Sequence, residues 1–121
     1  MIKVLIIDKE TGLLDSLKSY IKAKGHEAFA AKDTVEAAYF LKSEEPHLVF
    51  LDLLFLGTSS GLPLVERMKR TDKKRKIYLM SKFPAMCEIL AKRIGADGVI
   101  FKPFETTEIG KLIDRICQEP K

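Results

Sequence analysis

Short apolar runs alternate with amphipathic stretches five times along this chain, and no other feature restricts its fold as strongly. Some of the runs, such as HLVFLDL at 47–53, are apolar at successive positions, which is typical of strands buried on both faces. The stretches between the runs repeat their apolar residues at helical spacing. The sequence therefore predicts strands at 3–8, 27–31, 47–53, 77–80 and 98–101, and helices at 13–24, 34–43, 61–70, 84–94 and 107–118.

Strands and helices that alternate in this way form a parallel sheet with helices on both faces. Right-handed crossovers between the strands then give a doubly wound α/β sandwich of three layers. No repeat, low-complexity tract or linker interrupts the pattern, so we expect a single domain over residues 1–121.

The composition argues against several classes of protein. No apolar run reaches the roughly 18 residues of a membrane helix, and no secretion leader is evident, so we expect a cytoplasmic location and no membrane partner. Cys87 and Cys117 lack a C-x-x-C spacing, and we interpret both as buried or half-buried thiols. The net charge is only +4, and the basic stretch 69–76 has no aromatic residue for base stacking, so direct nucleic-acid binding is not favoured.

Four polar side chains stand where predicted strands end: Asp8, Asp52, Ser81 and Lys102. In a doubly wound sheet the carboxyl ends of the strands share one edge, and ligands bind there. Two carboxylates, a hydroxyl and an ammonium suit phosphoryl transfer to a carboxylate. One carboxylate attacks phosphorus, the other holds Mg²⁺, and the hydroxyl and ammonium bind phosphoryl oxygens.

The two histidines do not belong to this group. His26 and His47 precede predicted strands, which places them at the opposite edge of the sheet. We expect both to be turn or surface residues, and we see no pairing of His, Cys or Ser that indicates hydrolase chemistry.

The chain resembles the receiver domain of two-component response regulators over essentially its whole length. The matching stretches are VLIIDKE, PHLVFLDL, IYLMS and GADGVIFKPF, and the last of these is the most specific. The resemblance implies a flavodoxin-like (βα)5 fold with strand order 2-1-3-4-5. It also implies a signalling domain rather than an enzyme, which at most promotes its own phosphoryl transfer and dephosphorylation.

The resemblance assigns roles to three of the polar side chains. It implies that Asp52 is the phosphoacceptor, Ser81 the switch hydroxyl and Lys102 the lysine that binds the phosphoryl group. The peptide bond between Lys102 and Pro103 is expected to be cis. The implied partners are a sensor histidine kinase or phosphotransfer protein, a downstream protein and, as a further candidate, a second copy of this chain.

A lysine disturbs the metal site that the resemblance implies. The ligands of Mg²⁺ would be Asp8, Asp52 and the backbone carbonyl of Leu54, but the acidic residue that usually follows Asp8 is replaced by Lys9. Two unit charges about 4 Å apart interact by ~4 kcal/mol at an effective dielectric of about 20, and an ammonium beside Mg²⁺ costs roughly twice that. We therefore expect only weak Mg²⁺ binding. Lys9 either fills the place of the metal, by pairing with Asp8 or Asp52, or points to solvent.

Three further departures concern the response to a phosphoryl group. The loop after Asp52 has Leu56 in place of the usual proline and one extra residue before Gly61. Lys82 replaces the usual small residue after the switch hydroxyl, and Val99 replaces an aromatic switch residue. An isopropyl group cannot swing as a tyrosine ring does, so we expect weak coupling to the partner face. That face usually combines the last two helices and the last strand, and its candidate residues here are Phe101, Lys92, Arg93, Ile109 and Arg115.

Two mechanisms remain open within this family. In one, Asp52 still accepts a phosphoryl group from a histidine kinase. In the other, the domain is a pseudo-receiver, a protein-interaction module that works without phosphorylation. A nucleotide-binding flavodoxin-like domain is a less favoured interpretation, because the stretch DKETG after the first strand is a poor phosphate cradle.

Overall fold

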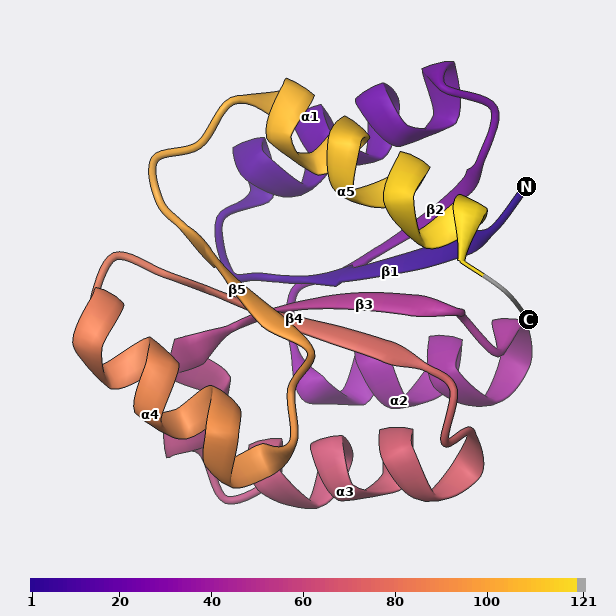
Figure 1. The fold of residues 1–121 in the computed structure, drawn as a ribbon. Helices are drawn as coiled ribbons and strands as arrows, with labels where there is room; N and C mark the ends of the chain where they lie inside the picture. The colour runs from indigo at the N-terminus through magenta and orange to yellow at the C-terminus, as the bar shows by residue number, and fades with distance from the viewer. Residues whose placement is uncertain (120–121) are drawn as a thin grey trace.

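The computed structural model describes residues 1–119 as a five-stranded parallel sheet between two layers of helices (Figure 1). The strands lie in the order β2-β1-β3-β4-β5, which confirms the predicted α/β fold and its 2-1-3-4-5 arrangement. The strands are β1 (Lys3–Ile7), β2 (Glu27–Ala31), β3 (Leu48–Asp52), β4 (Lys76–Ser81) and β5 (Gly98–Phe101). The helices are α1 (Thr11–Ala23), α2 (Thr34–Glu44), the 3-10 helix η1 (Leu53–Gly57), α3 (Gly61–Thr71), α4 (Pro84–Ile94) and α5 (Thr106–Gln118).

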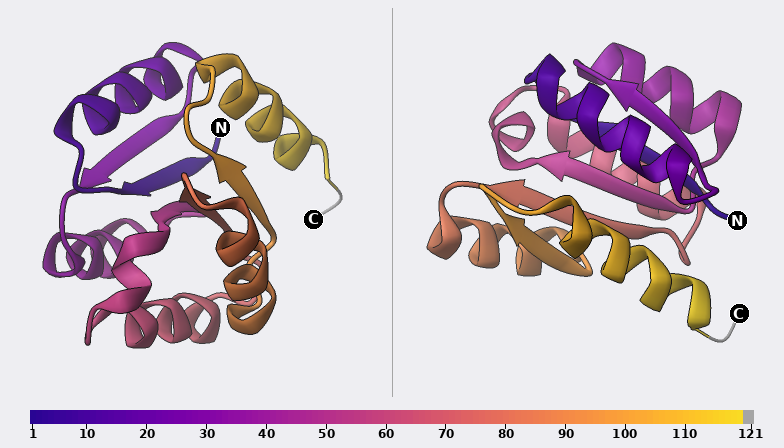
Figure 2. Two further views of the ribbon diagram at one scale, coloured as in Figure 1. Left: turned by 90° about the vertical axis from the view of Figure 1, so that its left-hand side faces the viewer. Right: turned by 90° about the horizontal axis from the view of Figure 1, so that it is seen from above.

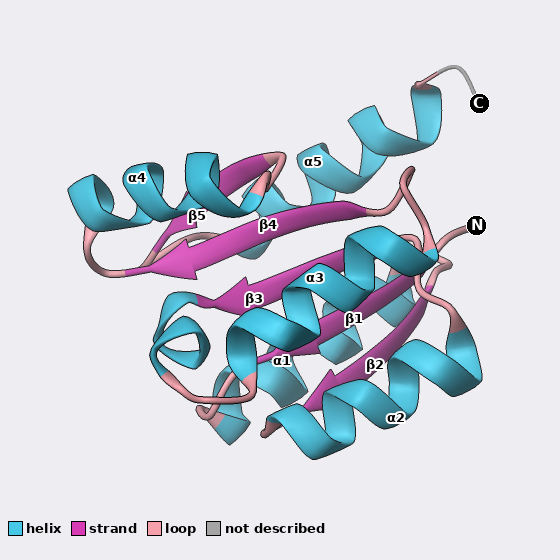
Figure 3. Cartoon of the chain, turned by 90° about the horizontal axis from the view of Figure 1, so that it is seen from below, coloured by secondary structure: helices cyan, strands magenta, loops and turns pink. Residues whose placement is uncertain are grey.

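The sheet separates two apolar cores. Helices α1 and α5 cover one face (Figure 2), and α2, α3 and α4 cover the other (Figure 3). Side chains of the central strands alternate between the two cores, so that Ile6 and Phe50 face α1 and α5 while Ile7 and Leu51 face the other helices. All four are fully buried, and burial of each such side chain stabilises the fold by about 1.5–3 kcal/mol. Strands β1 and β3 are thus held firmly on both faces.

Local signals fix several of the element boundaries. Asp33 caps α2 by accepting a hydrogen bond from the Glu36 N–H at 2.8 Å. Helix α4 ends at Gly95, whose φ of 72° lies in the left-handed region. At Gly61 a Cβ atom would lie 1.6 Å from the carbonyl oxygen of Phe55, so only glycine lets η1 pack against the start of α3.

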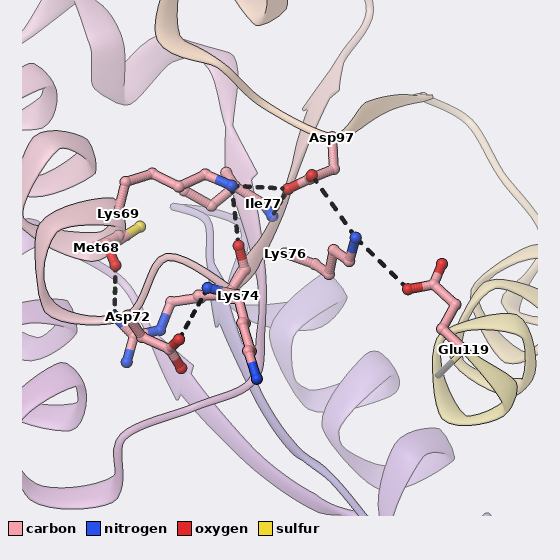
Figure 4. A network of polar contacts seen from close by, with 9 residues as sticks. Met68, Lys69, Asp72, Lys74, Lys76, Ile77, Asp97 and Glu119 are labelled. Carbon is pink, nitrogen blue, oxygen red and sulfur yellow. Dashed lines mark hydrogen bonds and ion pairs between the residues drawn. The ribbon is translucent and has the colours of Figure 1, made fainter. Parts of the chain in front are cut away.

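A polar network joins the elements at the amino edge of the sheet (Figure 4). The Oδ2 atom of Asp97 accepts from the Ile77 N–H at 2.8 Å and from Nζ of Lys69 at 3.0 Å. Nζ of Lys76 lies 4.0 Å from Asp97 and 3.5 Å from Glu119. Asp97 therefore connects β4 with α3 and, through Lys76, with the end of α5, at the edge opposite Asp52.

The histidines lie at this amino edge, as predicted, and they also bind the backbone of β1. Nδ1 of His26 accepts from the Ile2 N–H at 3.1 Å, and Nδ1 of His47 accepts from the Lys3 N–H at 2.9 Å. Each ring thus satisfies an amide group where β1 begins. This role was not predicted from the sequence.

The predicted burial of the thiols is correct for Cys87 and wrong for Cys117. Cys87 is buried on the inner side of α4, whereas Cys117 is exposed near the end of α5 because it lies outside the apolar stripe of that helix. Within residues 1–119, no helix combines the length and the apolar character that a bilayer-spanning segment requires.

Candidate functional site

The predicted side chains meet at the carboxyl edge of the sheet. Asp8 follows β1, Asp52 and Ser81 end β3 and β4, and Lys102 follows β5. The strand register aligns these ends, because Asp52 pairs with Met80 and Ser81 lies beside the last residue of β5. All four predicted side chains line one cavity of about 380 Å³.

Lys102 joins the two carboxylates. Its Nζ atom lies 2.6 Å from Oδ2 of Asp8 and 3.1 Å from Oδ1 of Asp52. The side chains of Lys102, Asp8 and Asp52 are only 9%, 2% and 9% exposed. Burial by itself lowers the pKa of Lys102, but hydrogen bonds and the negative charges of Asp8 and Asp52 outweigh it, so that its pKa is raised. The side chain therefore remains an ammonium group between the carboxylates.

The backbone orients the remaining carboxylate oxygens. Oδ1 of Asp8 accepts from the Glu10 N–H at 2.9 Å, and Oδ2 of Asp52 accepts from the Leu54 N–H at 3.2 Å. Each carboxylate thus has one oxygen on Lys102 and the other on an amide two residues further along the chain. Both are held in position before any ligand arrives.

Of the two alternatives for Lys9, the structure supports the one in which it points to solvent rather than pairing with Asp8 or Asp52. Lys9 is exposed, its Nζ atom lies 5.9 Å from the centroid of the Phe55 ring, and it forms no ion pair with a carboxylate of residues 1–119. Lys9 lies in a bend after β1 and lines the rim of the same cavity without forming an ion pair with either carboxylate. Lys102 occupies the place between the carboxylates instead, and the sequence analysis did not predict that contact.

Ser81 shapes the loop that leads into α4. Its Oγ atom is buried and accepts from the Phe83 N–H at 2.8 Å, while its carbonyl oxygen accepts from the Lys102 N–H at 2.9 Å. Lys82 is exposed at the rim of the same cavity. The peptide bond between Lys102 and Pro103 is cis, as predicted.

Not every residue predicted for the partner face lies on the surface. Lys92, Arg93, Phe101 and Arg115 are exposed, but Ile109 is fully buried, so its assignment to that face is wrong. Ile109 belongs to the apolar stripe of α5 that packs on the sheet. Several large apolar side chains are exposed on the outer side of α4 and just before it: Phe83, Met86 and Ile89.

The predicted Mg²⁺ site has two side-chain ligands, Asp8 and Asp52, and the structure brings them together. No group of three or more His, Cys, Asp or Glu side chains within residues 1–119 is placed to hold a metal ion. A third carboxylate, Glu10, lines the same cavity, and the Lys102 ammonium lies between Asp8 and Asp52. An ion held by Asp8 and Asp52 would therefore compete with that ammonium group for their oxygens.

Known proteins share this fold. The family model described as the response regulator receiver domain matches residues 4–114. The receiver domain of NtrX from Brucella abortus is 26% identical with a TM-score of 0.82, over 97% of this chain and 99% of that one. A two-component response regulator from Clostridium difficile is 24% identical with a TM-score of 0.85, over 98% of both chains.

One similar structure is a much longer protein. NtrX from Brucella abortus, in complex with ADP, is 26% identical with a TM-score of 0.83, and the match covers 95% of this chain but 26% of that chain. The present chain therefore corresponds to about a quarter of that NtrX chain.

Proposed function

Because this chain belongs to the response regulator receiver family, whose members interact with histidine kinases, we propose that it accepts a phosphoryl group on Asp52. The observation that supports this most directly is the position of Lys102, whose Nζ atom lies 3.1 Å from Oδ1 of Asp52. An ammonium group at that distance from the acceptor oxygen is suited to bind the oxygens of a phosphoryl group carried by Asp52.

The proposed step is a substitution at phosphorus. A carboxylate oxygen of Asp52 attacks the phosphorus atom of a phosphohistidine, an O–P bond forms, and the P–N bond breaks. The imidazole leaves with the bonding electron pair and takes up a proton from solvent. Lys102 balances the added charge, and the hydroxyl of Ser81, which lines the same cavity, donates to a phosphoryl oxygen.

The donor would be a sensor histidine kinase or a phosphotransfer protein, and a downstream protein would read the result. We propose that residues 1–121 form one receiver domain that acts in the cytoplasm, where receiver domains typically work. A second copy of the chain is a further candidate partner, whereas nucleic acid and membrane are not proposed. Weak Mg²⁺ binding also belongs to this proposal, because the Lys102 ammonium competes for the two carboxylates.

A pseudo-receiver is the second candidate function. The contact of Lys102 with both Asp8 and Asp52 supports it, because an ammonium group already occupies the place between the two carboxylates. In that case Asp52 is a structural residue, and the partner surface stays in one state.

Titration with beryllofluoride, a phosphoryl mimic, distinguishes the two candidates. The full chain and its Asp52→Asn variant are followed by amide NMR in the presence of Mg²⁺. Phosphoacceptor function predicts saturable shifts near Asp8, Ser81 and Lys102 in the wild type and none in the variant. Unchanged spectra of both proteins would reject that function and favour the pseudo-receiver.

A further inference from the structure

Arg75 is a buried cation far from the phosphoacceptor site. It lies in the turn between α3 and β4 and is 3% exposed. Its Nε atom donates to the carbonyl oxygen of Pro46 at 2.7 Å. Its Nη1 atom donates to the carbonyl oxygen of Met68 at 2.7 Å and to Oγ1 of Thr71 at 2.9 Å (Figure 4 shows Met68). These contacts join the end of α3 to the turn before β3, which gives two of the three guanidinium nitrogens a structural role.

The third nitrogen, Nη2, has no such role. Within residues 1–119 it donates to no protein atom, and no carboxylate forms an ion pair with Arg75. No buried side-chain nitrogen in that part of the chain lacks a hydrogen-bond partner, so Nη2 must be accessible to solvent. Arg75 lines a cavity of about 430 Å³ at the amino edge of the sheet, and we take its solvent-accessible Nη2 atom to face that cavity.

Other donors line the same cavity. His47 contributes a neutral donor, because its Nδ1 atom accepts from the Lys3 N–H and the ring then carries its hydrogen on Nε2. Lys42 from α2 and Arg67 from α3 add two positive charges. Besides Arg75, the cavity thus has donors from α2, from α3 and from the turn before β3.

The charge of the cavity favours an anion. Lys42, Arg67 and Arg75 supply three positive charges, and Glu45 and Asp72 supply two negative ones, which leaves a net charge of +1. Burial lowers the pKa of Arg75, although the charges of Asp72 and Glu45 oppose that effect. A buried guanidinium still remains charged at neutral pH. An anion in the cavity would therefore compensate a positive charge that the protein itself leaves only partly balanced.

We propose that this cavity binds an oxyanion, the phosphate or carboxylate group of a small molecule. Nη2 of Arg75 and the guanidinium of Arg67 are its charged donors, and Nε2 of His47 is its neutral donor. Planar guanidinium groups match the geometry of both anions, and the bonds they form with them are charge-assisted. The site lies at the end of the sheet opposite Asp52 and does not depend on phosphorylation there.

Titration of the full chain with inorganic phosphate, and separately with succinate, tests the proposal by NMR. Arg67→Gln removes a charged donor, and Arg70→Gln is the matched control, because Arg70 is an exposed arginine of α3 outside the cavity. Wild type and Arg70→Gln should bind with equal affinity, with saturable shifts at Lys42, His47 and the Arg75 Nε–H. Arg67→Gln should weaken binding by about tenfold, as expected for the loss of one charge-assisted bond.

A second variant tests the neutral donor. In His47→Asn the amide oxygen can still accept from the Lys3 N–H, whereas the Nε2–H donor is lost, and affinity should fall by about fivefold. Binding of phosphate alone would assign a phosphate-bearing ligand, and binding of succinate alone a carboxylate-bearing one. Any one of three results would overturn the proposal. These are no saturable shift at the cavity, shifts only around Asp52 and Lys102, or an equal loss of affinity in Arg67→Gln and Arg70→Gln.

Discussion

Nζ of Lys102 lies 2.6 Å from Oδ2 of Asp8, a residue 94 positions earlier in the chain. The same ammonium lies 3.1 Å from Oδ1 of Asp52. One lysine, which follows β5, therefore contacts side chains at the ends of β1 and β3. The positive charge between the two carboxylates thus comes from a side chain of the protein.

Replacement of Lys102 should weaken the fold. Lys102→Met leaves two buried carboxylates without their cation, and we expect the free energy of unfolding to fall by about 3 kcal/mol. Urea denaturation measures it, with Lys111→Met as a control because Lys111 is exposed on α5. Adding Asp8→Asn to Lys102→Met should restore part of the loss. A loss no larger than in the control would show that the ion pairs do not stabilise the fold.

Lys9→Asp should raise the affinity for Mg²⁺ several-fold or more. The substitution replaces an ammonium at the rim of the cavity with a carboxylate, and both the lost repulsion and the added ligand favour the metal. Mg²⁺ titration followed by NMR measures the dissociation constant. Lys111→Asp makes the same change of charge on α5 and should have little effect. Equal affinities in wild type and Lys9→Asp would mean that Lys9 does not oppose the metal.

His26 should make the stability depend on pH. Burial lowers the pKa of His26, as do the positive charges of the amino terminus and Lys24, while Asp114 opposes them. The folded-state pKa is thus below the unfolded value of about 6.5, so this contribution is present above about pH 6.5 and is lost as pH falls through the folded-state pKa.

The His26→Asn variant isolates this effect. Its amide oxygen can still accept from the Ile2 N–H, as Nδ1 of His26 does at 3.1 Å, but it does not titrate. Denaturation of both proteins from about pH 7.5 to about pH 5 should show the wild type losing stability relative to the variant. Parallel stability curves would contradict this account of His26.

Partner binding should depend only weakly on Asp52. Val99 is half-buried against the core beneath α4 and has no ring that changes position. We therefore expect a downstream partner, isolated by pull-down, to bind wild type and Asp52→Asn with similar affinity, with and without beryllofluoride. A difference above about tenfold, or ~1.4 kcal/mol of coupling, would show that the switch still operates.

The sequence predicted the fold and the position of the site for a physical reason. Apolar periodicity separates strands from helices, and parallel strands joined by right-handed crossovers bring their carboxyl ends to one edge. Asp8, Asp52, Ser81 and Lys102 therefore had to converge. The helical spacing of the apolar residues in α5 also indicates that Ile109 is buried and Cys117 is not. The predictions for these two residues were wrong because they did not take that spacing into account.

Side-chain partners were harder to predict. Lys9 and Lys102 are both long cations near Asp8, and the sequence does not tell which of them reaches it. In the structure Lys102 contacts Asp8, whereas Lys9 lies at the rim of the cavity with its Nζ atom near the Phe55 ring. The contacts of His26 and His47 with β1 likewise depend on the register between strands, which a single sequence leaves open.

The proposed function depends most directly on whether Asp52 becomes phosphorylated. The full chain and Asp52→Asn are incubated with acetyl phosphate, and their intact masses are compared. Attack by the Asp52 carboxylate releases acetate, so we predict one added phosphoryl group in the wild type and none in the variant. A group that persists in Asp52→Asn would contradict the assignment of the acceptor. Two unmodified proteins would contradict phosphoacceptor function and leave the pseudo-receiver.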